Sequence, residues 1–102
     1  MIPNKNAIFS LIRSNSQNIK ALGVESIGLF GSYVRDGQHD DSDVDFLVKF
    51  RKDQKTFDNF MNLCFLLETL MEHEIELVTI ESLSPYIAPY ILHEVEYVDL
   101  SS

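Results

Sequence analysis

The chain has 102 residues, of which 45% are hydrophobic, and its sixteen acidic residues against eight basic ones give a net charge of -8. This length fits one compact domain, expected to span residues 1–102, and leaves no room for a second core. The acidic balance argues against nucleic acid as a direct partner, because such binding needs a field of Lys and Arg. No apolar run approaches the roughly 20 residues that would span a membrane. No signal peptide is visible, and the single Cys64 rules out an internal disulfide, so we expect a cytoplasmic protein.

The first third of the chain predicts a helix, a buried strand and a short second helix. Asn4 is suited to cap a helix that runs as far as Gly23. Residues 24–30 form an apolar run bounded by glycine, which is typical of a buried strand. Gly31 ends this strand, and Ser32 caps a short helix through about residue 36, before turn-forming residues 37–42. The first helix is predicted from apolar residues at helical spacing, which are Ile8, Leu11, Ile12, Ile19 and Leu22.

The rest of the chain predicts two further strands and two further helices. Residues 43–50 alternate as a strand, and residues 75–80 form another. A long amphipathic helix separates them, and a last helix over 84–94 carries Pro89 near its start. Tyr97 to Leu100 are expected to form an edge strand or an ordered tail. The predicted fold is a small α/β (α+β) domain with a mixed β-sheet and helices packed mainly on one face. The long helix is marked by Phe57, Phe60, Met61, Cys64, Leu67, Leu70 and Met71.

Two aspartates on the predicted second strand suggest a metal site. Asp43 and Asp45 are two residues apart, so their side chains should point to the same face with Cα atoms roughly 6.5–7 Å apart. Carboxylates at this spacing can hold two Mg²⁺ ions about 3.5–4 Å from each other. An EF-hand calcium loop beginning at Asp41 is rejected, because that loop needs glycine and glutamate where this chain has Phe46 and Lys52.

The Gly-Ser pair before these aspartates is suited to binding phosphate. Gly31 permits close backbone approach, and the helix that follows presents unpaired N–H groups beside the Ser32 hydroxyl. Arg35 lies on the same helical face, where it could contact a phosphate. The other polar candidates are predicted to be structural: the three histidines as solvated or helix-ending residues, Cys64 as a core residue, and Tyr86 and Tyr90 as core or partner contacts.

Taken together, Gly31-Ser32, ten residues and then Asp43-Val44-Asp45 resemble the signature of the minimal nucleotidyltransferases of the DNA polymerase beta superfamily. The later segment EIELVTIESLSPYIAPYILHEVEYV resembles the end of MntA-type antitoxins, which are paired with HEPN-domain toxins. The family's usual glycine after the arginine is Asp36 here, displaced to Gly37.

This resemblance implies the roles of the site residues. Asp43 and Asp45 would bind two Mg²⁺ ions, and a third carboxylate would come from the strand IELVTI. Glu76 aligns with that position, where many relatives have aspartate, and Glu74 is the second choice. Ser32 would hold the triphosphate of ATP, with Gly31 making room for it.

The resemblance also implies an activity, the transfer of AMP from ATP to a tyrosine of a HEPN ribonuclease toxin, which is thereby neutralised. The toxin would be the protein partner, and a homo-oligomer or a hetero-oligomer with the toxin stays open. Two alternatives remain. One is a non-catalytic antitoxin module that blocks the toxin by contact. The other is a transferase for a small molecule such as an aminoglycoside, against which the lack of room for an acceptor domain argues.

Overall fold

The computed structural model describes residues 4–35 and 43–100. The turn predicted over 37–42, with His39 and Asp41, lies outside these residues. The elements follow the order α1 (Lys5–Ser14), α2 (Ser16–Ala21), β1 (Val24–Phe30), α3 (Ser32–Arg35), β2 (Val44–Phe50), α4 (Phe57–Met71), β3 (Ile75–Thr79), the 3₁₀ turn η1 (Ile80–Ser82), α5 (Ala88–Glu94) and β4 (Glu96–Tyr97).

The predicted first helix is two helices. The expected cap is present, since Asn4 Oδ1 accepts a hydrogen bond of 2.9 Å from the Ala7 N–H. The prediction of one continuous helix was wrong at Asn15, whose backbone leaves the helical region with φ of -115° and ψ of 20°. The Asn15 side chain donates to the Leu11 carbonyl, an example of an amide competing with the helix for its own backbone. The second helix stops as expected at Gly23, with φ of 86°.

The four strands form one mixed sheet in the order β3-β2-β1-β4. β1 is antiparallel to both β2 and β4, whereas β2 and β3 are parallel and are connected through α4. In the parallel pair Val44 lies opposite Ile75, Asp45 opposite Glu76 and Phe46 opposite Leu77. The carboxylates of β2 and β3 are therefore brought to the same end of the sheet.

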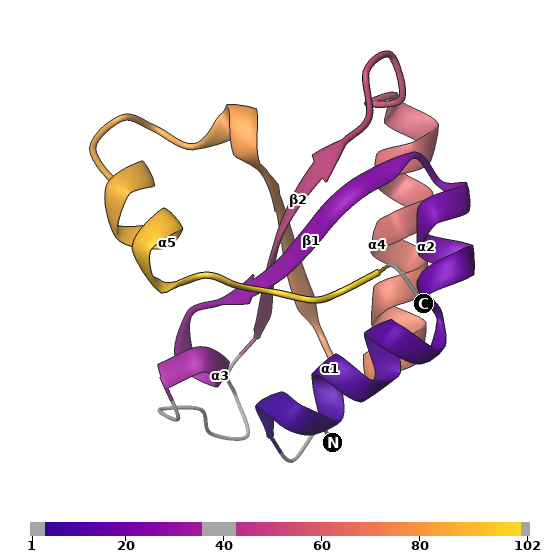
Figure 1. Cartoon of the computed structure of the whole chain (residues 1–102), viewed down its shortest axis with the longest axis horizontal. Helices are drawn as coiled ribbons and strands as arrows, with labels where there is room; N and C mark the ends of the chain where they lie inside the picture. The colour runs from indigo at the N-terminus through magenta and orange to yellow at the C-terminus, as the bar shows by residue number, and fades with distance from the viewer. Residues whose placement is uncertain (1–3, 36–42, 101–102) are drawn as a thin grey trace.

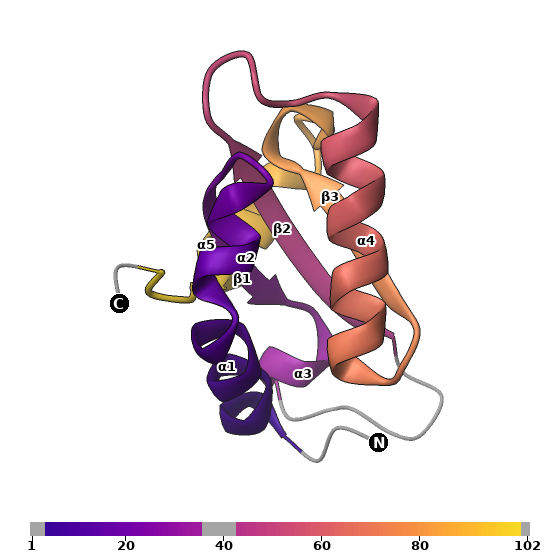
Figure 2. The ribbon, with the colours of Figure 1, turned by 90° about the vertical axis from the view of Figure 1, so that its right-hand side faces the viewer.

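Helices α1, α2 and α4 lie on one side of the sheet, and α5 lies on the other (Figures 1 and 2). The expected packing mainly on one face is confirmed. Leu47 is fully buried although its strand neighbours Phe46 and Val48 face the main core, so the side of the sheet beneath α5 is not open along its whole length. The main core includes Ile8, Ile12, Ile19, Val24, Ile27, Leu29, Phe46, Val48, Leu63, Leu67 and Met71.

The long helix α4 begins and ends where the apolar spacing predicted, but part of its buried face differs. Thr56 caps it by accepting a hydrogen bond of 3.1 Å from the Asn59 N–H. Phe57, predicted on the buried face, is 78% exposed in the first turn of α4, where it lines a surface pocket. Leu63, which the predicted stripe omitted, is fully buried, and Cys64 is only half-buried.

The last third of the chain is less regular than predicted. β3 ends at Thr79 and passes into η1, one residue before the expected end of the strand. α5 begins at Ala88 instead of residue 84, with Pro89 in its first turn, where its missing N–H costs no helical hydrogen bond. Of the edge strand or ordered tail expected over Tyr97 to Leu100, only Tyr97 is in a strand, since β4 covers Glu96–Tyr97. Residues 98–100 form a tail in which Val98 and Leu100 are buried. Within the described residues, no helix is long and apolar enough to cross a membrane.

Candidate active site

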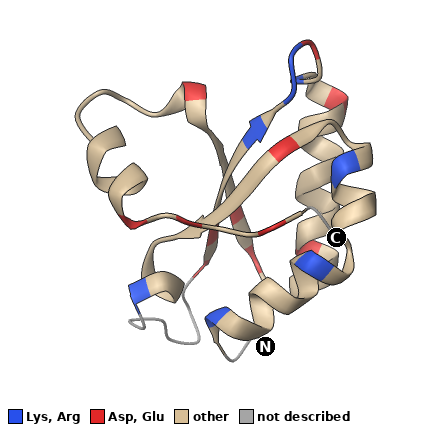
Figure 3. Cartoon of the chain, viewed as in Figure 1, with Lys and Arg blue, Asp and Glu red and all other residues tan. Residues whose placement is uncertain are grey.

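Three acidic residues lie together where β2 and β3 begin. Asp43 immediately precedes β2, Asp45 is its second residue, and Glu76 is the second residue of β3. The register places Asp45 directly opposite Glu76. Asp43 and Glu76 are exposed, whereas Asp45 is half-buried. Figure 3 shows these acidic segments at the lower part of the sheet, near the basic segment on α3.

The pKa of the Asp45 carboxyl is raised by its surroundings. Burial is the largest cause, followed by the negative charges of Glu76 and Asp43 and a hydrogen bond with Glu76, and together they raise the pKa of Asp45 from 3.8 to about 6. The positive charge of Arg35 acts in the opposite direction. The electrostatic coupling shows that Asp43, Asp45, Glu76 and Arg35 share one neighbourhood.

The backbone of Gly31, directly after the adjacent strand β1, lies against the Asp45 side chain. Its φ of 83° lies in the left-handed region, and a Cβ placed on it would collide with Asp45 Oδ2 and lie 3.2 Å from Asp45 Cγ. Only glycine combines this backbone conformation with so close an approach. The loop predicted to hold phosphate is therefore in direct contact with the acidic cluster.

The short helix α3 is held by its second residue. Tyr33 is buried, and its ring contacts the ring of His73 edge-on, with centroids 6.5 Å apart. Ser32, half-buried, precedes this anchor directly. Ser32 thus lies between Gly31, which contacts Asp45, and the buried Tyr33.

A fourth acidic residue joins this neighbourhood, and sequence reasoning missed it. Glu94, the last residue of α5, accepts a 2.8 Å hydrogen bond from the Gly31 N–H and pairs with Arg35 Nη1 at 2.7 Å. The two residues of the first contact are 63 positions apart in the sequence, and those of the second are 59 apart. No local sequence pattern could therefore predict these contacts.

The second-choice carboxylate, Glu74, is placed differently. It precedes β3, and its backbone carbonyl accepts a hydrogen bond of 3.2 Å from the Val44 N–H. Glu74 is not among the charges that raise the pKa of Asp45, whereas Glu76 is. This favours Glu76 over Glu74 as the third carboxylate.

The donor chemistry of the cluster fits a hard cation such as Mg²⁺, because hard cations prefer oxygen ligands and the cluster consists of carboxylates. The negative charges of Glu76 and Asp43 help to raise the pKa of Asp45, and a bound cation would offset that repulsion. No three His, Cys, Asp or Glu side chains in the part of the chain that the structure describes are already arranged around a common metal position. The predicted ligands Asp43, Asp45 and Glu76 therefore lie near one another but are not arranged as a preformed metal-binding group.

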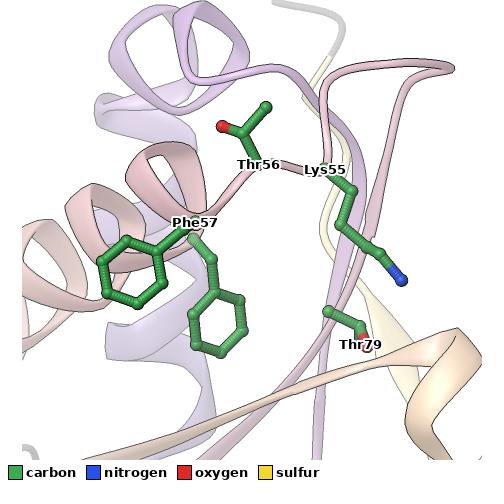
Figure 4. A pocket seen from close by; sticks show the side chains of 5 residues that line it. Lys55, Thr56, Phe57 and Thr79 are labelled. Carbon is green, nitrogen blue, oxygen red and sulfur yellow. The ribbon is translucent and has the colours of Figure 1, made fainter.

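A separate pocket of about 270 Å³ lies at the other end of β3, lined by Lys55, Thr56, Phe57, Phe60 and Thr79 (Figure 4). Thr79 is the last residue of β3 and Glu76 lies near its first, so this pocket does not include the acidic cluster. The apolar lining comes mainly from the start of α4.

Four of the remaining candidates, Tyr86, Tyr90, Cys64 and His93, are not among the groups that perturb the pKa of Asp45. Tyr86 and Tyr90 are 85% and 77% exposed, so the core packing considered for them was wrong. Burial, with a smaller effect from Glu68, raises the pKa of the Cys64 thiol, which disfavours a reactive thiolate. His93 is in the last turn of α5, as expected for a histidine near a helix end.

The comparison with solved structures defines the class of protein. A protein assigned as a minimal nucleotidyltransferase superposes with a TM-score of 0.70 and 25% identity, over 86% of this chain and 93% of that one. A crystal structure of a toxin-antitoxin with AMP-PNP gives a TM-score of 0.62 and 25% identity, over 81% of this chain and 71% of that one. The fold is that of the small nucleotidyltransferases, as the Gly-Ser and Asp-x-Asp residues predicted.

The sequence comparisons identify the family. The sequence model of the nucleotidyltransferase domain family matches residues 10–98 of this chain. The protein adenylyltransferase MntA of Thermococcus cleftensis is 39% identical over 92 residues, which are 89% of this chain and 92% of that protein. The chain belongs to the nucleotidyltransferase domain family and is an enzyme of that family.

Proposed function

We propose that the chain is an antitoxin that transfers AMP from ATP to a tyrosine of a HEPN ribonuclease toxin and thereby silences it. The observation that carries this proposal is the pairing of Asp45 with Glu76 beside Gly31, in a chain 39% identical to a protein adenylyltransferase. The toxin-antitoxin structure with AMP-PNP supports a toxin partner and a nucleoside triphosphate as substrate.

The site residues divide the work of the reaction. Asp43, Asp45 and Glu76 would hold two Mg²⁺ ions, which when bound lower the pKa of the attacking hydroxyl and neutralise charge on the leaving group. Ser32 would hold the triphosphate through its hydroxyl and the N–H groups at the start of α3, with Gly31 making room for it and Arg35 beside it. Most of the rate acceleration would then come from positioning and from stabilising charge.

The bond changes are those of an in-line substitution at phosphorus. The tyrosine oxygen forms a bond with the α-phosphorus of ATP, and the bond from that phosphorus to the oxygen bridging the β-phosphate breaks. Pyrophosphate leaves, the tyrosine carries AMP, and the phenolic proton is lost to Glu76 or to water. A carboxylate beside Asp45 suits Glu76 to this proton transfer.

The acceptor is proposed to be a separate protein that docks on this domain. The net charge of -8 complements a basic RNA-cutting partner, and complementary charge accelerates such an encounter. A complex with the toxin is therefore the expected assembly, in the cytoplasm where that toxin would act.

The decisive experiment mixes the chain with ATP labelled at the α-phosphate, Mg²⁺ and the toxin that co-purifies with it. We expect label on the toxin, lost in the Asp43→Ala/Asp45→Ala variant. The matched control removes two exposed acids of α4, Asp58→Ala/Glu68→Ala, and should retain transfer. Toxin inhibition that persists unlabelled in the aspartate variant would instead identify a non-catalytic binding module.

A further inference from the structure

We propose that Glu94 is a positioning residue for the nucleotide. Its carboxylate ties both ends of the Gly31–Arg35 segment to α5 and so shapes the phosphate-binding loop. This inference rests on the proposed function, since it concerns how ATP is held. One carboxylate oxygen, Oε2, accepts from the Gly31 N–H at 2.8 Å, and the other, Oε1, pairs with Arg35 Nη1 at 2.7 Å. Glu94 thus touches the first and the last residue of the segment.

These contacts determine where the loop lies relative to the acidic cluster. Gly31 is already in contact with Asp45 on one side, so a small displacement of its backbone would change the gap between the loop and the carboxylates. Tyr33 anchors the middle of the segment through burial, and Glu94 holds its two ends. Charge-assisted hydrogen bonds of this length are stronger than neutral ones.

The location of Glu94 also argues that the carboxylate serves the loop and not its own helix. A negative charge in the last turn of a helix faces the negative end of the helix dipole and is locally unfavourable. Residues that break a local rule in this way are expected at functional sites. The Glu94 side chain is 22% exposed, whereas that of Arg35 is 61% exposed, so most of the Arg35 side chain remains accessible to a phosphate.

The test measures binding of a non-hydrolysable ATP analogue with Mg²⁺ to the full chain by calorimetry. Glu94→Ala should weaken the affinity for the analogue by roughly tenfold or more, as expected from the loss of hydrogen bonds to a charged group. The matched control is Glu96→Ala, which breaks the ion pair between Glu96 and Lys5 at 3.0 Å, outside the proposed site, and should leave the affinity unchanged. In the transfer assay the KM for ATP should rise in Glu94→Ala while the KM for the toxin does not change.

A second measurement avoids reliance on a variant that does not fold. Glu94→Gln keeps the shape of the side chain but removes its charge, so the Gly31 amide proton should move upfield in the NMR spectrum of the ligand-free chain. An unmoved Gly31 resonance, or an unchanged affinity in Glu94→Ala, overturns the inference.

The opposite result is equally informative. If Glu94→Ala binds the analogue more tightly, Glu94 competes with the triphosphate for the same donors and does not position it, which also overturns the inference. If the wild-type chain binds no analogue at all, the proposed function itself fails, and the inference fails with it.

Discussion

Asp45 on β2 lies directly opposite Glu76 on β3, and after burial the negative charge of Glu76 is the largest cause of the raised pKa of Asp45. Neighbouring strands run about 4.8 Å apart, so paired acids at this register repel each other once both are ionised. This repulsion and the burial of Asp45 make the ligand-free site unfavourable near neutral pH. The predictions on pH below follow from that relationship.

Replacing Asp45 by Asn should stabilise the fold at neutral pH. The pKa of Asp45 is raised from 3.8 to about 6, so the stability from burying its neutral form is fully present below pH 3.8 and is lost as pH rises through about 6. Because the side chain is only half-buried, we expect about 1–2 kcal/mol after allowing for solvent screening. The free energy of unfolding measured in urea at pH 7.5 should therefore be higher for Asp45→Asn than for the wild type.

The same comparison at low pH is the control for that prediction. Near pH 4 the wild-type carboxyl is largely protonated in the folded chain, so the two proteins should differ little in unfolding free energy. A difference between Asp45→Asn and the wild type that is constant from pH 4 to 7.5 would contradict the raised pKa.

Binding of Mg²⁺ with the ATP analogue should weaken as pH falls through about 6. A cation at this site must displace the proton from Asp45, so affinity should drop by up to about tenfold per pH unit below that value. Calorimetry at pH 5 and pH 7.5 measures the change. Asp45→Asn has no proton to lose there, and its residual affinity should vary little over the same interval.

Glu76 and Glu74 should behave differently in the transfer reaction. Glu76→Gln should lower kcat on the order of 10²-fold, because it removes charge beside Asp45 where the reacting groups meet. Glu74→Gln makes the same chemical change two residues away and should have a small effect, since Glu74 does not perturb Asp45. Equal losses of kcat in the two variants would show that the total negative charge of this region matters, and not the specific pair of Asp45 and Glu76.

Gly31→Ala should impair both folding and nucleotide binding. The left-handed backbone strain costs about 1–3 kcal/mol, and the added Cβ collides with Asp45. Gly23→Ala is the matched control, because Gly23 has a similar φ of 86° and an added Cβ would lie 2.5 Å from Gln54 Cβ, at the opposite end of β1 from Gly31. Thermal unfolding should report losses in both variants, while calorimetry should report weakened nucleotide binding only in Gly31→Ala.

Most elements of this fold are predictable from the sequence because their signals are local. The apolar run ending at Gly31 gave β1, the alternation after Asp43 gave β2, and the helical spacing of apolar residues gave α4. The break at Asn15 was missed because both sides of it carry the same apolar spacing, and only the side-chain contact with Leu11 reveals it.

The site was predictable to the extent that its residues are adjacent in sequence. Gly31 and Ser32, or Asp43 and Asp45, form short patterns whose chemistry can be argued from spacing alone. The choice of Glu76 over Glu74 came from the resemblance, whereas the register that places Glu76 opposite Asp45 could not be derived from the sequence. The contact of Glu94 with Gly31 needed the packing of α5, which nothing in the local sequence encodes.

The narrow pairing of β4 has a consequence for the motions of the chain. β4 lies at an edge of the sheet, where two residue pairs join it to β1. A 2.9 Å hydrogen bond from the Val98 N–H to the Ile27 carbonyl follows them. Segments with so few bonds open at a lower free energy than the core does. Opening of β4 would loosen α5, so the Gly31 amide should exchange with deuterium faster than the amides that pair β1 with β2.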